Sequence, residues 1–192
     1  MQDVIQILPR YLEAGFNTVE IAMNTPDAEG IIRNALAQYP GKLNIGAGTV
    51  CNVSDLDKAL LAGAQFIVTP VMDEQIINTC VKERVPVFSG AYTPSEIYKA
   101  WNLGASMVKV FPASTLGPAY LKELRGPLSE IKLMPTGGIN IDNCIEFFSA
   151  GAAALGIGSQ LFDERSIVDK TWDVLTDHFK KFIVKINGRN NL

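Results

Sequence analysis

The amino-acid sequence predicts an α/β protein, a (β/α)8 TIM barrel that lacks its first strand. Segments of helical and strand character alternate along the chain, and several strands are nearly all apolar, as in a parallel sheet covered on both faces. The 192 residues are 47% hydrophobic, which suits a single domain over residues 1–192. A glycine that can take the left-handed conformation ends four helices just before a strand, at Gly15, Gly63, Gly104 and Gly151.

The order of elements begins with a helix, so the place of a barrel's first strand stays empty. A strand upstream of the first helix would be needed to close the barrel. Helical apolar spacing predicts helices at residues 5–14, 27–38, 54–62, 73–82, 95–103, 118–124, 142–150 and 167–186. Short apolar runs between them predict strands at residues 18–23, 43–49, 66–70, 85–89, 107–111, 132–136 and 154–158.

The overall charge and composition argue against several classes of partner. The net charge of −3 disfavours nucleic acid and anionic membranes as partners. No apolar run reaches the roughly 18 residues of a membrane span, and the first residues do not form a signal peptide. The three cysteines, Cys51, Cys80 and Cys144, lack metal-ligand spacing. They are typical of reduced thiols, so we expect a cytoplasmic protein.

Lys109 interrupts the apolar run 107–112, which otherwise has the pattern of a buried strand. A lysine is almost never fully buried unless it forms an ion pair or takes part in the chemistry of a site. Burial disfavours the ammonium form and leaves a nucleophilic amine, as in a Schiff-base catalyst. Glu20 interrupts the run 18–23 in the same way and would supply a proton shuttle in the same apolar space. A structural ion pair in the barrel core explains the pattern equally well.

Glycines follow the last two predicted strands, where barrels often bind phosphate through backbone N–H groups. They are the pair Gly137 and Gly138, and then Gly158 with Ser159. The stretch 160–162 could form a short helix whose N-terminus points at the anion. Either pair alone would be an ordinary turn, whereas both pairs at these two strand ends favour a phosphate site.

Six segments in order carry a resemblance that no single one of them would establish. They are Val19-Glu20-Ile21-Ala22-Met23-Asn24-Thr25, Ile45-Gly46-Ala47-Gly48-Thr49-Val50, Val68-Thr69-Pro70, Val108-Lys109-Val110-Phe111-Pro112-Ala113, Pro135-Thr136-Gly137-Gly138-Ile139 and Gly156-Ile157-Gly158-Ser159. Together they resemble the signature set of the 2-keto-3-deoxy-6-phosphogluconate and phosphogalactonate aldolases. These are class I aldolases with a (β/α)8 fold, usually trimeric.

By this resemblance Lys109 forms a Schiff base with the C2 ketone of a 2-keto-3-deoxy-6-phosphosugar acid, and Glu20 acts as general acid and base. Cleavage of the C3–C4 bond releases glyceraldehyde 3-phosphate and then pyruvate. The protonated imine is the electron sink, so no cofactor and no metal are implied. The implied partners are the phosphorylated keto-acid substrate, pyruvate and two further copies of the chain in a homotrimer. Implied contacts are Asn24, Thr49, Pro70, Phe111 and Thr136 for the substrate, and Gly137, Gly138, Gly158 and Ser159 for its phosphate.

Asn24 departs from the phosphogluconate-type pattern, which usually has an arginine there to grip the carboxylate in a bidentate manner. Members of the phosphogalactonate type carry asparagine in a very similar setting. The smaller 4-hydroxy-2-oxoglutarate, which lacks the phosphate, also stays open as a substrate. Two alternatives to the aldolase remain: a phosphosugar epimerase or isomerase on the same barrel, and a non-catalytic phosphosugar-binding remnant.

Overall fold

An open, curved parallel sheet is the centre of the fold. The computed structural model describes residues 2–188. Within this range six strands pair side by side in chain order, each parallel to the next. They are β1 (Thr18–Ala22), β2 (Asn44–Gly48), β3 (Ile67–Val68), β4 (Val87–Ala91), β5 (Met107–Val110) and β6 (Leu133–Pro135).

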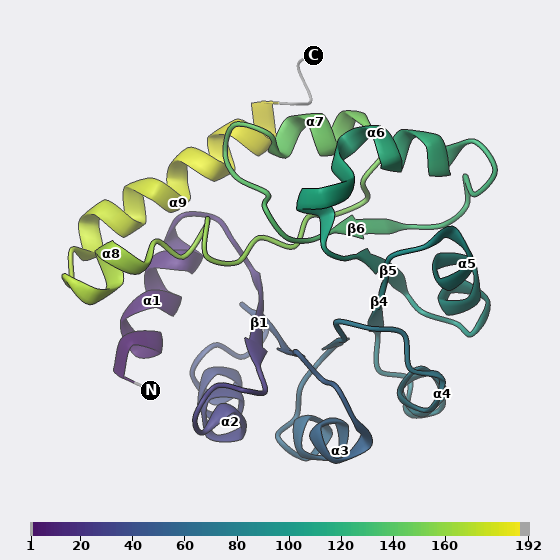
Figure 1. Cartoon of the computed structure of the whole chain (residues 1–192). Coiled ribbons are helices and arrows are strands. Elements are labelled where there is room, and N and C mark those ends of the chain that lie inside the picture. Colours follow the sequence, from purple (N-terminus) through teal and green to yellow (C-terminus); the bar gives the residue numbers. More distant parts are fainter. Residues whose placement is uncertain (1, 189–192) are drawn as a thin grey trace.

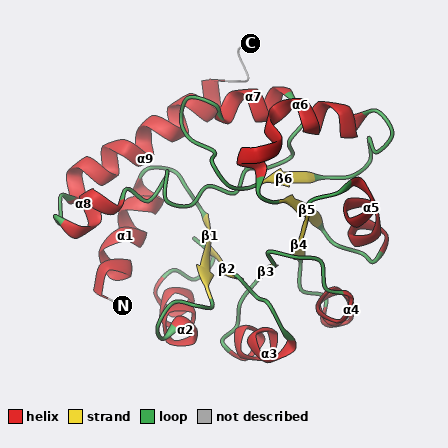
Figure 2. Cartoon of the chain, viewed as in Figure 1, coloured by secondary structure: helices red, strands yellow, loops and turns green. Residues whose placement is uncertain are grey.

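Helices alternate with these strands and lie on the outer side of the arc that the strands form (Figure 1, Figure 2). The first ones are α1 (Gln2–Glu13), α2 (Ala28–Gln38), α3 (Val53–Leu61), α4 (Glu74–Glu83) and α5 (Pro94–Asn102). They are followed by α6 (Ala113–Arg125), α7 (Cys144–Ser149), α8 (Glu164–Val168) and α9 (Trp172–Asn187). No helix within residues 2–188 is long and apolar enough to cross a membrane.

Side-chain caps begin three successive helices directly after strands. The Asn52 side chain accepts a hydrogen bond from the backbone of α3, and Asp73 does the same for α4. Thr93 and Glu96 form a reciprocal capping box at the start of α5. Each cap satisfies backbone N–H groups that a helix start leaves without partners. These helices therefore begin within a residue or two of where the sequence predicts them.

The four glycine corners are confirmed. Gly15, Gly63, Gly104 and Gly151 have φ angles of 104°, 88°, 99° and 96°. A side chain would strain the backbone in this region, which glycine enters freely. Each of these glycines turns the chain from a helix into the next strand or strand-like segment, as the repeated sequence pattern predicts.

The prediction of a (β/α)8 barrel is wrong. The sheet has six strands and stays open between β1 and β6, and the predicted strand 154–158 is reduced to one parallel bridge, Thr136 to Gly156. Gly156 lies so close to Thr136 that a Cβ at position 156 would be 2.2 Å from the Thr136 Oγ1. Glycine weakens a strand and often marks such a close backbone approach. The fold is a half-barrel of parallel strands.

Two predicted helices near the end of the chain also differ from the structure. The predicted helix 167–186 is two helices, α8 and α9, because Lys170 between them has a left-handed φ of 54°. The predicted short helix at 160–162 is a single turn, in which the Phe162 N–H donates to the Gly158 carbonyl at 3.0 Å. The resemblance to a barrel's phosphate-binding helix is therefore not reproduced there.

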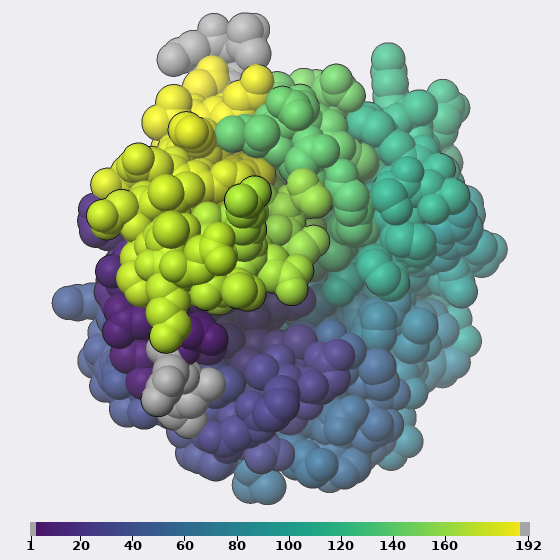
Figure 3. Space-filling view, turned by 60° about the vertical axis from the view of Figure 1, so that its left-hand side comes forward, coloured from purple at the N-terminus to yellow at the C-terminus, as the bar shows by residue number. Residues whose placement is uncertain are grey.

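An aromatic cluster joins the helices beside β1 to the end of the chain. The Tyr11 ring stacks on Phe16 at 4.6 Å and on Phe162 at 5.7 Å, and meets Phe179 of α9 edge-on at 5.5 Å. The Tyr11 hydroxyl donates to the Thr18 carbonyl at 2.7 Å, which fastens α1 to β1. In the space-filling view the C-terminal helices cover the N-terminal segment on this face (Figure 3). The packing stabilises the open side of the sheet.

The two faces of the sheet carry different kinds of residue. Val108 and Val110 of β5 are fully buried in the main core, which the sheet forms with the helices. Successive side chains of a strand point to opposite faces, so Met107 and Lys109 lie on the concave, inner face. A second, smaller apolar cluster occupies this inner face. This inner cluster consists of Phe66, Val68, Phe88, Met107, Met134 and Ala154.

Candidate active site

Lys109 is a buried lysine on the inner face of β5, with 7% of its surface exposed. Its register neighbours are Gly90 on β4 and Met134 on β6, and neither carries a charge. Burial lowers the pKa of the Lys109 ammonium, while the electrostatic influence of Glu20, and to a lesser extent of Cys51, opposes this effect. The amine therefore loses its proton more easily than an ordinary lysine, which favours nucleophilic chemistry.

Glu20 projects from β1 and lies over Gly48 of the neighbouring strand. A Cβ at position 48 would be 2.7 Å from the Glu20 Cδ, so the missing side chain makes room for the carboxylate. The Glu20 residue is exposed as a whole, yet enough protein surrounds its carboxylate to raise the pKa of that group by desolvation. The charge of Lys109 opposes that rise. The two groups, both in the described range, influence each other electrostatically without forming a direct ion pair.

Phe111 and the segment after β6 lie beside Lys109. The Lys109 Nζ is 5.3 Å from the centre of the Phe111 ring, which is 38% exposed. A Cβ at Gly137 would be 3.6 Å from the same ring. The Thr136 carbonyl accepts a hydrogen bond from Ala113 at 2.8 Å, which holds the start of α6 next to this segment. Lys109, Phe111, Thr136 and Gly137 are thus brought together as the sequence suggests.

Gly138 contacts a residue that the sequence reasoning missed, Ser114. With a φ of 71°, Gly138 comes so close to Ser114 that a Cβ at position 138 would be 2.6 Å from the Ser114 Cβ. Gly158 and Ser159 are both exposed, and a Cβ at Gly158 would have nothing within 4 Å. No backbone hydrogen bond within residues 2–188 joins these two residues to the Gly137–Gly138 pair. The signal for Ser114 was its place directly after the Pro112-Ala113 end of the lysine motif.

The other implied substrate contacts lie at the ends of the first three strands. Asn24 is exposed in the turn after β1, and Thr49 is half-buried after β2 with a left-handed φ of 53°. Neither side chain makes a hydrogen bond within the described residues, which leaves both free for a ligand. Pro70 abuts Gly90, where a Cβ would be 2.2 Å from the Pro70 carbonyl carbon.

Thr69 holds this last contact; the sequence marks it only as part of the Val68-Thr69-Pro70 segment, without a role at the site. Its hydroxyl accepts from the Gly90 N–H at 3.0 Å and donates to the Val71 carbonyl at 2.6 Å. The side chain is buried with 1% exposed. It therefore ties the loop after β3 to β4, at the residue that pairs with Lys109.

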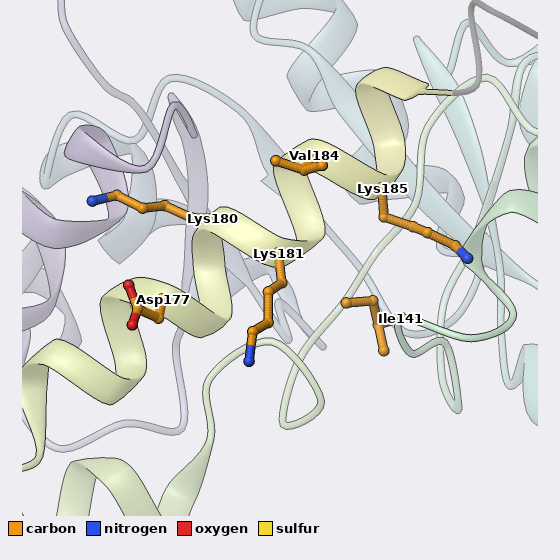
Figure 4. A pocket seen from close by; sticks show the side chains of 6 residues that line it. All are labelled: Ile141, Asp177, Lys180, Lys181, Val184 and Lys185. Atoms are coloured by element: carbon orange, nitrogen blue, oxygen red, sulfur yellow. The ribbon is translucent and has the colours of Figure 1, made fainter.

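A hollow on the outside of the molecule is unrelated to these residues. Its volume is about 500 Å³, and in Figure 4 Lys181 and Lys185 extend on the side of Ile141. It lies between the loop before α7 and the exposed face of α9, and none of the predicted site residues line it. Its lining residues are Ile141, Asp177, Lys180, Lys181, Val184 and Lys185.

The curved parallel sheet and the lysine–carboxylate pair on its inner face define a class of α/β protein with a buried amine in a half-barrel. Comparison with known proteins identifies the family to which the chain belongs. The family description "KDPG and KHG aldolase" matches residues 1–178. The chain belongs to this family.

Individual relatives agree with this assignment. The chain is 36% identical over 161 residues to the 2-dehydro-3-deoxy-6-phosphogalactonate aldolase of Escherichia coli K12, covering 83% of this chain and 78% of that protein. The solved native KDPGal structure superposes with a TM-score of 0.91 at 30% identity, covering 100% of this chain and 91% of the other. The KDPG aldolase of Legionella pneumophila, solved with pyruvate as a covalent carbinolamine, has a TM-score of 0.87 at 27% identity, covering 93% and 87%.

Proposed function

We propose that the protein is a class I aldolase that cleaves a 2-keto-3-deoxy-6-phosphosugar acid, of the phosphogalactonate or phosphogluconate type, to pyruvate and glyceraldehyde 3-phosphate. The observation that carries the proposal is the buried Lys109, which shares the inner face of the half-barrel with Glu20 and forms no ion pair with any carboxylate of residues 2–188. A structural ion pair would bring the two charged groups into contact. Family membership and the carbinolamine captured in the Legionella relative support the same chemistry.

The first half of the reaction forms the imine. The unprotonated Lys109 Nζ attacks the C2 ketone of the substrate and gives a carbinolamine. Glu20, whose pKa is raised by burial, can hold the proton that the departing water needs. Loss of water leaves a protonated imine between Lys109 and C2, which is a strong electron sink.

The second half breaks the C3–C4 bond. The ionised Glu20 takes the proton of the C4 hydroxyl, directly or through water, and the electrons of the C3–C4 bond move into the imine. Glyceraldehyde 3-phosphate leaves, and the pyruvate enamine stays on Lys109. Protonation of the enamine at C3, followed by hydrolysis of the imine, releases pyruvate and regenerates the amine.

The rest of the site would position the two ends of the substrate. Thr49 and Asn24 have free side-chain donors and would hold the carboxylate end, while Pro70 and Phe111 shape the pocket. Thr136, Gly137 and Gly138 would hold the phosphate, joined by Gly158 and Ser159 across the opening. Asn24 favours the phosphogalactonate type of substrate. The family description also extends the proposal to the shorter 4-hydroxy-2-oxoglutarate.

Reductive trapping tests the proposal directly. The protein is incubated with pyruvate and cyanoborohydride, and peptides are mapped by mass spectrometry for wild type, Lys109→Ala and the exposed control Lys122→Ala. A pyruvyl adduct on Lys109 in wild type and in the control, absent from Lys109→Ala, is the expected result. A folded wild type without an adduct would overturn the aldolase. Phosphosugar binding without turnover would then indicate a binding protein, and turnover without an adduct an epimerase or isomerase.

We also propose a cytoplasmic homotrimer in which residues 1–192 form one domain. The homotrimer is the assembly that the resemblance to the family implies, and the cytoplasmic location follows from the reduced thiols expected of Cys51, Cys80 and Cys144. Light scattering after size-exclusion chromatography should give three times the mass of one chain, and a monomer mass would contradict the trimer.

A further inference from the structure

No member of the inner cluster lies on a helix. Its members lie on strands, directly before β3 (Phe66) or on the strand-like segment around residue 154. The main core, on the opposite face, joins the sheet to the helices without them. The inner cluster is therefore not needed to hold helices against the sheet, and its position on the inner face calls for another role.

The cluster forms a continuous apolar floor next to Lys109. The Phe66 and Phe88 rings stack with centroids 5.3 Å apart and planes inclined by 26°. Gly46 makes this possible, because a Cβ there would be 2.2 Å from the Phe66 ring. Met107 precedes Lys109 by two residues on the same face of β5. The floor therefore extends from β3 to β6, on the face of the sheet that carries Lys109.

Met134 is the member that lies beside the lysine itself. It is the register partner of Lys109 on β6 and is 7% exposed. Side chains in register on neighbouring parallel strands share a face and lie next to each other. The charged or titratable groups that act on Lys109 are Glu20 of β1 and Cys51 after β2. The inner-face residues of β3, β4 and β6 are uncharged.

We propose that the inner cluster, and Met134 above all, is a positioning element of the reaction: it excludes water from the base of the site, so that Lys109 meets the substrate ketone as a free amine. The inference rests on the proposed role of Lys109 as the Schiff-base nucleophile. Burial is the main cause of the lowered pKa of Lys109, which agrees with such a role. Polar atoms in the floor would admit water and restore the ammonium form.

The test replaces the thioether of Met134 by an amide of similar length. In Met134→Gln the pKa of Lys109 should move toward its ordinary value, because water reaches the amine. If the pKa of Lys109 rises by one unit, the fraction of free amine at pH 7 falls about tenfold, and the rate of pyruvate trapping falls with it. The difference from wild type should shrink to about twofold near pH 10.5, the ordinary pKa of lysine, and vanish above it. Loss of structure alone would lower the rate equally at every pH.

Three further variants make the result specific. Met134→Leu keeps an apolar side chain and should keep the pH profile of wild type. Met72→Gln makes the same chemical change at a half-buried methionine outside the inner cluster and should leave the profile unchanged. Met107→Gln, at a less buried position of the cluster, should shift the profile in the same direction and serves if Met134→Gln does not fold.

The outcomes separate this inference from the proposed function. Absence of an adduct in wild type would refute the function of Lys109 itself. An adduct in wild type, with an unshifted pH profile in folded Met134→Gln and Met107→Gln, would overturn only the role of the inner cluster. A shift in both variants, with Met134→Leu and Met72→Gln unchanged, is the expected result.

Discussion

Gly48→Ala should reduce catalysis while leaving the protein folded. The Cβ of the new alanine would lie 2.7 Å from the Cδ and Oε1 of Glu20 and 3.1 Å from its Oε2. Ordinary van der Waals contact begins at 3.4 Å, so the carboxylate must retreat by at least about 0.7 Å. Glu20 can do this by changing its side-chain torsions, because the clash involves the far end of a flexible side chain.

The size of the effect follows from the role that we propose for Glu20. A misplacement of about 1 Å in a catalytic group can lower a rate by about 100-fold. We therefore expect kcat for aldol cleavage to fall by about 10- to 100-fold, with a smaller change in KM. Stability should not fall, because Gly48 has no left-handed φ, and alanine is about 0.5–1 kcal/mol better than glycine inside a strand.

Coupling pyruvate release to lactate dehydrogenase gives kcat and KM, and calorimetry gives Tm. Gly126→Ala is the matched control, since a Cβ at this helix end would meet only the Glu123 carbonyl at 3.5 Å. Gly126→Ala should keep the kcat and KM of wild type and should not lower Tm. If Gly48→Ala folds and retains the full kcat, the placement of Glu20 over residue 48 has no part in catalysis.

Three other substitutions test the energetics of the site and of the strand beside it. Ser89→Ala should raise the free energy of unfolding by about 1 kcal/mol, because the buried Ser89 hydroxyl has no hydrogen-bond partner within residues 2–188. In denaturant unfolding the exposed Ser106→Ala should change nothing, and a less stable Ser89→Ala would contradict the reasoning. Thr69→Val should lose about 1–3 kcal/mol, because the Gly90 N–H and the Val71 carbonyl lose their partner; an unchanged midpoint would show that water replaces the hydroxyl. Lys109→Met should raise Tm at pH 7, because the folded state lowers the pKa of Lys109 and so disfavours its charged form. This cost is present below the lowered pKa and fades as the pH rises to the ordinary value of 10.5, so the gain in Tm should shrink over that window, and a gain independent of pH would refute it.

The sequence was sufficient to predict the helices before residue 150, the strands before residue 136 and the two charged residues on the inner face. The reason is local: a charge inside an apolar run breaks a pattern that can be recognised without any partner strand. Glu20 and Lys109 stand out among apolar neighbours in this way. Alternation along each strand then places both on the face opposite to the main core.

Barrel closure could not be predicted, because it depends on pairing between segments far apart in the chain. The run 154–158 has strand-like composition, but within the described residues it forms a single bridge, from Gly156 to Thr136 just after β6. Lys170 interrupts the predicted helix 167–186 because its backbone has a left-handed φ. A lysine rarely adopts this conformation, so the residue type does not predict it. Gly48 and Ser114 became informative only when the register showed which atoms approach them.

The alternation along β5 shows how one short strand serves stability and chemistry at once. Val108 and Val110 are buried in the main core and stabilise the fold, while Met107 and Lys109 face the opposite side. A charge on the helix-facing side would have to be neutralised inside the main core, whereas on the inner face it stays within reach of a ligand. An open half-barrel with its own apolar floor can therefore desolvate an amine without giving up the core that holds the helices. This separation predicts that polar substitutions in the inner cluster change the pH dependence of the reaction more than they change Tm, and that polar substitutions at Val108 or Val110 do the reverse.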